Sequence, residues 1–590
     1  MTILRKPGLQ ASTLQETAET AQALPLRSPD QVSTLERLGS LHQTRISFVR
    51  SIMRKMMAEG WRISRERFDI DDQGYGTVIY RIDTPGERYS QVIFSHYLDP
   101  AERSDRVIAQ KWDVACALCE GEVSAERLEE LRANIPRQEA GRNRASDIVL
   151  SRANKSVRNF DYLVDMLAQG RQPDPAVLAR VGYLLRTTAV YGNGKFGIAD
   201  YARVRHSRAF ALPFSAQMFA VYLLRHFSIE LVEHLARVRS PTTAVPLNDA
   251  IRRYIGTGNA TGLGMAPFLV NHPRLLDRWV RARETAIARV LYRGRASRPL
   301  LTRLLALVDR ARIYLQETQT EDKRQFLEYQ RTLEELESFR TQVNGELGNF
   351  AGEAAPGEVW RRLSQWAQDH GSLETQELIN SLLMELYPEL VDELEGQMAA
   401  DEDLDLAPAM PLDDLRTLIE QHYHWALSID FDCPQQQYLF WYRSADKEEP
   451  RLGIRGQEPG ADKEFKLTTV ARTVQELYRT LQSLPQTERA QPTVTFLLRY
   501  PQYRGIVRRI QSLRGYEYGE VRTNLLHRDT LPIHLLRAKL SFFGASKFDP
   551  KSDRWVRISL FQGAPLVSDI GQDWEDDWLF PVMPTRQERG

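Results

Sequence analysis

The chain has 590 residues, of which 42% are hydrophobic and 26% are charged, so it can build several buried cores and is not a largely disordered protein. Its formal net charge is zero, whereas a nucleic-acid-binding protein usually keeps an uncompensated basic surface. Three cysteines are too few for a disulfide framework, which favours a reducing compartment and predicts a cytoplasmic protein.

The first 35 residues contain many Gln, Thr, Ser and Ala residues and predict a mobile tail. Polar residues follow Arg5 and Lys6, so this tail does not have the pattern of a secretory signal. The longest uncharged stretch, between Arg208 and Arg225, holds 16 residues. A membrane-spanning helix needs roughly 20 apolar residues, so we expect a buried helix there and no insertion into a membrane.

Residues 36–145 predict an N-terminal α+β domain. An amphipathic pattern that ends at Gly60 predicts a helix over 36–60. Extended runs separated by turn residues then predict a small antiparallel sheet, with strands at 61–70, 76–84 and 89–98. Apolar residues at helical spacing predict that the domain closes with helices over 106–118 and 124–135.

Residues 146–300 predict a central helical domain. Apolar residues recur there at three- and four-residue spacing, which predicts helices over 148–170, 174–190 and 214–238. Charged helices continue over 301–400, where the polar surface predicts an acidic helical arm.

Charge is segregated along the chain. The stretch from Glu317 to Asp405 holds 22 acidic and 6 basic side chains, whereas Arg274 to Arg312 and Arg499 to Arg557 are each strongly basic. The simplest interpretation is that these segments neutralise one another across domain contacts. The acidic arm could also join copies of the chain into a homo-oligomer.

An acidic linker at 401–414 leads to a C-terminal α+β domain over 415–590. Apolar and polar residues alternate over 422–433, which predicts a strand, and a second strand at 438–444 would complete a hairpin. We expect helices at 468–483, 493–513 and 531–543 and a late strand at about 555–561. The predicted fold class is therefore mainly α with α+β flanking domains: a central helical domain between small antiparallel sheets near the N- and C-terminal parts.

The most distinctive motif is the glycine-rich segment from Gly256 to Gly264. Its TGxxxGxG spacing resembles the dinucleotide-binding turn of short-chain dehydrogenases, and Tyr191 and Lys195 match their YxxxK spacing. However, Tyr191 and Lys195 precede the glycines instead of following them, and no βαβ pattern surrounds the motif. The segment therefore predicts a flexible turn with exposed backbone amides.

A second glycine-rich turn is predicted at 191–197, and glycine-rich backbone beside Lys, Arg and His side chains is typical of sites for phosphate or carboxylate. Both turns could instead be plain helix-capping turns. If they form one site, its anion-binding residues would be Arg186, Gly192, Asn193, Gly194, Gly258, Asn259, Gly262 and Arg274. The candidate acids, bases or catalytic cations would be His206, His272 and Lys195.

Other motifs favour structural roles. His226 and His234 are eight residues apart on one predicted helix, about 12 Å along its axis, which is too far for one metal ion. The lone pair Cys116 and Cys119 predicts core packing within a helix. Nothing in the sequence identifies a metal site or an organic cofactor.

The leading hypothesis is an intracellular enzyme that binds a small anionic substrate or cofactor in the central helical domain. One alternative is a non-catalytic interaction or regulatory protein that uses its charged helical surfaces. A further alternative is a nucleic-acid-binding factor, because arginines and tyrosines alternate over 499–522, although the neutral net charge disfavours it.

Overall fold

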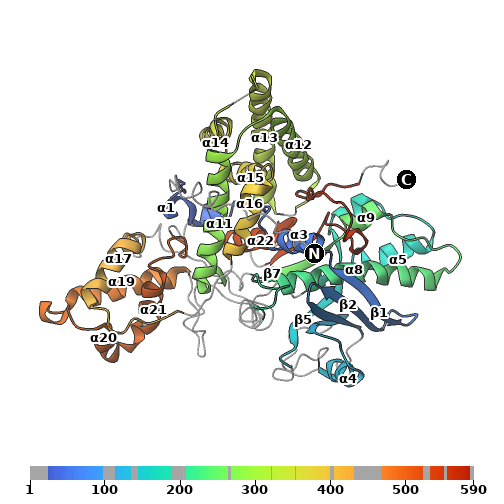
Figure 1. The fold of residues 1–590 in the computed structure, drawn as a ribbon, viewed down its shortest axis with the longest axis horizontal. Coiled ribbons are helices and arrows are strands. Elements are labelled where there is room, and N and C mark those ends of the chain that lie inside the picture. The colour runs from blue at the N-terminus through green and yellow to red at the C-terminus, as the bar shows by residue number, and fades with distance from the viewer. Residues whose placement is uncertain are drawn as a thin grey trace, which may run out of the picture.

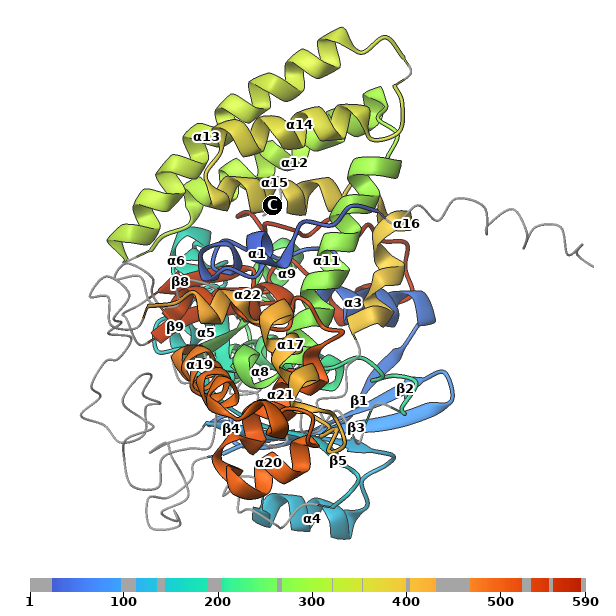
Figure 2. The ribbon, with the colours of Figure 1, turned by 90° about the vertical axis from the view of Figure 1, so that its left-hand side faces the viewer.

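A computed structural model describes residues 24–96, 113–134, 144–187, 204, 206–262, 268–320, 322–352, 354–398, 404–430, 467–522, 532–550 and 555–584. Three lobes surround a central layer (Figures 1 and 2). A β-sheet with its helices forms one lobe, four long helices form the second, and the helices between residues 412 and 513 form the third.

One mixed sheet of nine strands organises the first lobe, in the order β1-β2-β3-β4-β5-β6-β7-β9-β8. Strands β1 to β6 pair antiparallel in chain order, β6 and β7 pair parallel, and β9 pairs antiparallel with both β7 and β8. The strands are Arg62–Ile70, Gly76–Thr84, Glu87–Ser95, Val114–Glu120, Asp147–Lys155, Tyr183–Thr187, Gly256–Gly262, Lys547–Pro550 and Trp555–Leu560 for β1 to β9.

This sheet contradicts the predicted fold class. Strands β5, β6 and β7 lie where the sequence predicts a central helical domain, and β8 and β9 complete the same sheet instead of a second, small one. Strand β4 also replaces part of the helix predicted over 106–118. Both faces of this strand are buried, so its sequence is a continuous apolar run and does not alternate between apolar and polar residues. A short apolar run does not distinguish a buried strand from a buried helix, which explains the error.

Helices cover both faces of the sheet. The long helix α8 (Ser215–Arg239) packs against β4 to β7 on one face, together with α5 (Phe160–Ala168). The helix α4 (Ala125–Asn134) covers the opposite face beside β3 and β4, where Leu128 and Leu131 contact the sheet. The helix predicted over 214–238 is thus confirmed. No helix within the described ranges combines the length and the apolar character that crossing a membrane requires.

The second lobe confirms that residues 301–400 are largely helical. Its helices are α12 (Arg298–Glu317), α13 (Lys323–Asn349), α14 (Glu358–His370) and α15 (Leu373–Met384). They pack on one another through buried side chains of α13 such as Leu336 and Phe339. Their surface charges pair within the lobe, as Arg340 Nε does with Asp309 Oδ1 at 2.8 Å.

The third lobe contains α17 (Leu412–His422), α18 (His424–Leu427), α19 (Leu467–Ser483), α20 (Thr493–Arg499) and α21 (Arg504–Leu513). The strand predicted from residue 422 is wrong where the chain is described, because α17 ends at His422 and α18 follows it. Residues 431–433 and the predicted strand at 438–444 lie outside the described residues. Of the other predicted C-terminal helices, those at 468–483 and 531–543 are confirmed, the latter as α22 (Pro532–Phe543) in the central layer. The helix predicted over 493–513 is divided into α20 and α21, and β9 confirms the late strand.

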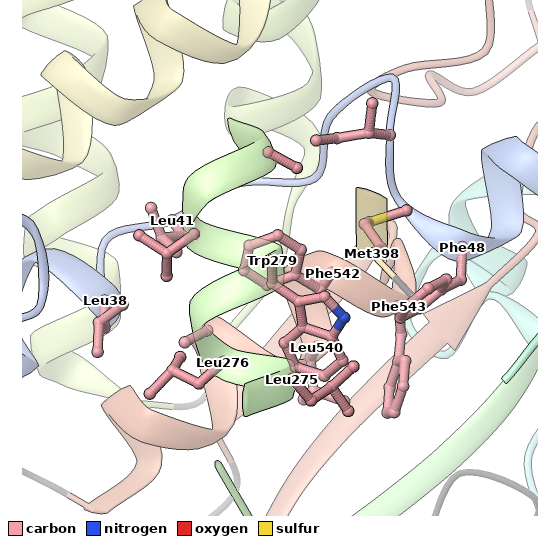
Figure 3. Close-up of a cluster of buried hydrophobic side chains, with 14 of the residues drawn as sticks. Leu38, Leu41, Phe48, Leu275, Leu276, Trp279, Met398, Leu540, Phe542 and Phe543 are labelled. Atoms are coloured by element: carbon pink, nitrogen blue, oxygen red, sulfur yellow. The ribbon is translucent and has the colours of Figure 1, made fainter. Parts of the chain in front are cut away.

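The central layer is an aromatic core built from distant parts of the chain (Figure 3). Trp279 on α11 (Pro273–Arg293) stacks on Phe542 of α22, with ring centroids 4.9 Å apart. Phe48, at the start of α3 (Phe48–Glu59), meets Trp279 edge-on at 5.6 Å. The predicted helix over 36–60 is therefore split, with α2 (Leu35–Leu38) preceding α3.

Buried ion pairs connect the segments that form this layer. Arg50 on α3 is fully buried, with its Nη2 2.9 Å from Glu385 Oε2 and its Nε 2.8 Å from Asp576 Oδ1. Burial opposes the ionisation of Asp576, but the charges of Arg50 and Arg54 outweigh it and lower its pKa to about 2. Glu374 on α15 behaves likewise beside Arg537 and His42, and its pKa is lowered to about 2.

We expect the protein to lose stability in acid. A carboxylate whose folded-state pKa is depressed stabilises the fold above its unfolded pKa of about 4, and this contribution disappears as the pH falls toward 2. Burial also lowers the pKa of His42 in the folded state. As the pH falls below about 6.5, this histidine is therefore protonated in the unfolded state before it is protonated in the folded state, and the stability begins to fall. The midpoint temperature of unfolding should decline below pH 6 and steeply below pH 4. A midpoint that is unchanged between pH 5 and pH 3 would contradict this assignment.

Candidate functional site

A row of side chains crosses five strands on the face of the sheet that α4 also occupies. Asp113 continues the register of β4 and its backbone N–H donates to Asn154 Oδ1 at 3.1 Å. Asn154 on β5 pairs with Arg186 on β6, and Arg186 pairs with Gly258 on β7. Directly paired residues point to the same face of a sheet, so this row and Arg557 of β9 lie on one side.

A cavity of about 370 Å³ lies over this row, and we call it the sheet pocket. Its wall is completed by the loop that leaves β5 and by the chain that enters β6. The residues around it are Asp113, Asn154, Lys155, Ser156, Val157, Arg158, Val181, Tyr183, Arg186 and Arg557. Four of these side chains are cationic and Asp113 is the only carboxylate among them, so the sheet pocket is positively charged.

Two of the cations have no counter-charge in the part of the chain that the structure describes. Among the described residues, neither Arg158 nor Arg186 has a hydrogen-bond or ion-pair partner for its guanidinium group, and both side chains are exposed. Arg557 is held more loosely than in a normal ion pair, with its Nη1 3.9 Å from Asp549 Oδ2. Guanidinium groups in this state are free to bind the oxygens of a phosphate or a carboxylate.

Tyr183 forms the wall of the sheet pocket above Gly258. A Cβ atom at position 258 would lie 2.4 Å from the tyrosine ring, so only glycine leaves room for it. Burial raises the pKa of Tyr183, and the charges of Arg557, Arg186 and Arg158 oppose this shift without cancelling it. The phenol therefore stays protonated at neutral pH and can donate a hydrogen bond to an anion.

The structure brings together some of the predicted anion-binding residues. Arg186 lines the sheet pocket and is paired with Gly258 on the neighbouring strand, but Asn259 is paired with Thr187 and its side chain is buried on the opposite face. The prediction of a turn at 256–264 is wrong over the described part, because β7 runs from Gly256 to Gly262. The other turn, with Gly192, Asn193, Gly194 and Lys195, lies outside the described residues.

His206 belongs to a different cavity. That cavity measures about 490 Å³ and is lined by His206 together with Glu87, Tyr89 and Glu120. It also touches Ile148 at the start of β5, whereas the sheet pocket lies at the end of that strand. Seven residues of strand separate Ile148 from Lys155, which is roughly 23 Å. His206 therefore cannot act on a ligand in the sheet pocket.

The two remaining predicted residues lie at the start of α11. His272 precedes its first turn, and Arg274 packs over the ring of Tyr516, 5.2 Å from its centroid. Neither residue lines the sheet pocket. Those residues predicted for one site that the structure describes are thus distributed over four places: the sheet pocket, the opposite face of the sheet, the cavity at His206 and the start of α11.

The other motifs have structural roles. Within the described ranges no group of three or more His, Cys, Asp or Glu residues could hold a metal ion. Cys116 and Cys119 are buried on opposite faces of β4, and burial raises the pKa of the Cys116 thiol to about 11. Core packing is therefore confirmed for this pair, although it lies on a strand and not in a helix.

The C-terminal arginines are largely engaged inside their own lobe. Arg509 is buried and donates from both Nε and Nη2 to Glu520, at 2.6 and 2.8 Å. Arg499 pairs with Glu488 at 3.2 Å, and the guanidinium of Arg508 donates to the carbonyl oxygen of Leu404. These contacts remove much of the free positive charge that a nucleic-acid surface would need.

Sequence reasoning missed Asp113, Asn154, Tyr183 and Arg557 because they belong to four different strands. One signal was available in the sequence, the alternation of polar and buried residues along a strand. Arg152 and Asn154 are two positions apart on β5, and Arg557 lies between the buried residues Val556 and Ile558 of β9. A scan against protein-family models and searches of curated proteins and of solved structures give no match to this chain, so its candidate function rests on the geometry of the sheet pocket.

Proposed function

We propose that this protein binds a small molecule through its phosphate or carboxylate group in the sheet pocket. One observation carries the proposal: Arg158 and Arg186, whose guanidinium groups have no partner among the described residues, lie at the same cavity, and Asp113 is the only acid in its described lining. Charge-assisted hydrogen bonds from Arg to a carboxylate or phosphate are about twice as strong as neutral ones and are often bidentate.

The surrounding side chains suit an anion of this size. Arg557 adds a third guanidinium and Lys155 adds an ammonium group at the wall. Tyr183 offers its phenol as a neutral donor, and it can contact an uncharged part of the ligand with its ring. The described lining holds neither His nor Cys, and the proposed role is binding. The proposed anion site lies on the sheet and not in the helical domain expected from the sequence.

Replacing Arg186 with Ala should weaken the binding of pyrophosphate at least tenfold. Losing one charge-assisted contact costs about 1.5–3 kcal/mol, which is roughly a tenfold to hundredfold change in Kd. The measurement is a calorimetric titration of the full chain with pyrophosphate at low ionic strength, where screening is weak.

Arg171→Ala is the matched control, because Arg171 is an exposed arginine on the turn after α5 and is not part of the sheet pocket. It removes the same charge and should leave Kd within a factor of about two. The proposal fails if the wild-type chain gives no binding heat, or if both variants lose affinity equally, since the latter indicates only a general effect of net charge.

A further inference from the structure

The carboxylate of Asp113 is fixed at one end of the sheet pocket. Its Oδ2 accepts the backbone N–H of Lys155 at 2.9 Å, and its own backbone N–H is held by Asn154. Among the described residues, none forms a hydrogen bond or ion pair with the other oxygen, Oδ1. This oxygen therefore remains available to accept a hydrogen bond from a ligand in the cavity that Asp113 lines.

The acid and the arginines are separated across the sheet. Asp113 lies at β4 and Arg186 at β6, with one strand between them. At about 4.8 Å per strand, the two backbones are roughly 10 Å apart, and β9 with Arg557 is roughly 10 Å further on. A free phosphate held by the arginines would thus leave Asp113 unused, whereas a longer ligand can reach both ends.

We infer that the ligand is a phosphate ester whose carbon skeleton carries a hydroxyl group a few bonds from the phosphate. This inference rests on the proposed function and specifies its ligand. The arginines bind the phosphate, and Asp113 Oδ1 accepts the hydroxyl hydrogen. The carboxylate of Asp113 would repel a second anionic group of the ligand. It stabilises a hydroxyl donor, because a hydrogen bond to a charged group is worth about 1.5–3 kcal/mol.

Charge favours phosphate over carboxylate as the anionic group. A phosphate monoester carries about −1.5 to −2 charges at pH 7 and so balances both Arg158 and Arg186, whereas a carboxylate balances only one of them. The volume of the sheet pocket also favours a phosphate ester. The cavity of about 370 Å³ offers roughly ten times the 30 Å³ that one water molecule occupies in the liquid, which is more than a phosphate ion alone fills.

The test compares ribose 5-phosphate with inorganic phosphate by calorimetric titration of the full chain. We expect the wild-type protein to bind ribose 5-phosphate at least tenfold more tightly than phosphate. In Asp113→Ala this preference should disappear, while the affinity for inorganic phosphate stays the same or rises because a nearby negative charge is removed. Asp113→Asn keeps an acceptor for the N–H of Lys155 and should lose part of the preference, which controls for a disturbed loop.

Asp161→Ala is the charge control, because Asp161 is exposed on α5 and does not line the cavity. It should retain the full preference for ribose 5-phosphate. The inference is overturned if wild type binds both ligands equally, or if Asp113→Ala keeps the preference. Failure of the proposed function looks different, since neither ligand would then bind the wild-type protein.

Discussion

Replacing Arg225 with Met is expected to lower the free energy of unfolding by about 3–5 kcal/mol. Arg225 lies on α8 with an exposed fraction of 2%, and its guanidinium donates only to backbone carbonyl oxygens. The acceptors belong to two segments and are Arg252, Arg253, Ile255, Ala564 and Pro565, at 2.6–3.1 Å. Methionine fills similar space but leaves the carbonyl oxygens of Arg252, Ile255 and Ala564 without this donor, and each costs about 1 kcal/mol or more. The carbonyl oxygens of Arg253 and Pro565 still accept from the backbone N–H of Gly563 and the hydroxyl of Tyr222.

Chemical unfolding in urea, followed by tryptophan fluorescence, measures this loss. Arg237→Met is the matched control, because Arg237 is exposed on the same helix and, among the described residues, its guanidinium donates only to the carbonyl oxygen of Glu233 within that helix. We expect the control to change stability by less than about 0.5 kcal/mol. Equal stability of the two variants would mean that α8 does not depend on this side chain for its attachment to β7 and the C-terminal segment.

The second large effect is expected for Glu377→Gln. Glu377 on α15 is fully buried and pairs with Arg27, Arg37 and Arg283, at 2.8, 2.5 and 2.5 Å. These arginines hold its pKa well below the usual range, although burial opposes ionisation. In the variant, Glu284 still pairs with Arg27 and Arg283, but Arg37 has no ion-pair partner left among the described residues. Leaving a buried charge without its partner costs about 3–5 kcal/mol.

Because Arg27 and Arg37 precede α3, this substitution should also loosen the N-terminal segment. Trypsin should then cleave after Arg37 faster in Glu377→Gln than in wild type. Glu334→Gln, at an exposed position of α13, provides the control and should leave both stability and cleavage unchanged. Normal stability together with unchanged cleavage in Glu377→Gln would show that this ion-pair cluster does not hold the segment in place.

The elements that the sequence predicts well are the long helices. α8, α12 and α13 each extend over many turns of a regular apolar pattern, so their identity is decided locally. The strands β4 to β7 are decided by pairing with distant segments. In β7, for example, a run of small residues, which by itself indicates a turn, becomes extended because β6 and β9 supply hydrogen bonds on both sides.

The candidate site could be predicted only in part for the same reason. Arg186 and Gly258 were predicted as anion-binding residues, and the register of β6 and β7 does pair them. Tyr183 and Arg557 join them only because β6 and β9 lie on either side of β7, and β7 and β9 are about 300 residues apart in the sequence. Asp113 becomes a candidate only after the cavity is known, since an aspartate at the start of a strand has no distinguishing pattern.

The most direct test of the central claim is a crystal structure of the protein with bound tungstate, a phosphate analogue whose metal gives an anomalous signal. The account predicts the strongest anomalous peak in the sheet pocket, within hydrogen-bond reach of Arg158 and Arg186. A structure in which tungstate binds only elsewhere, such as at the arginines of the third lobe, while the sheet pocket holds no peak, would contradict it.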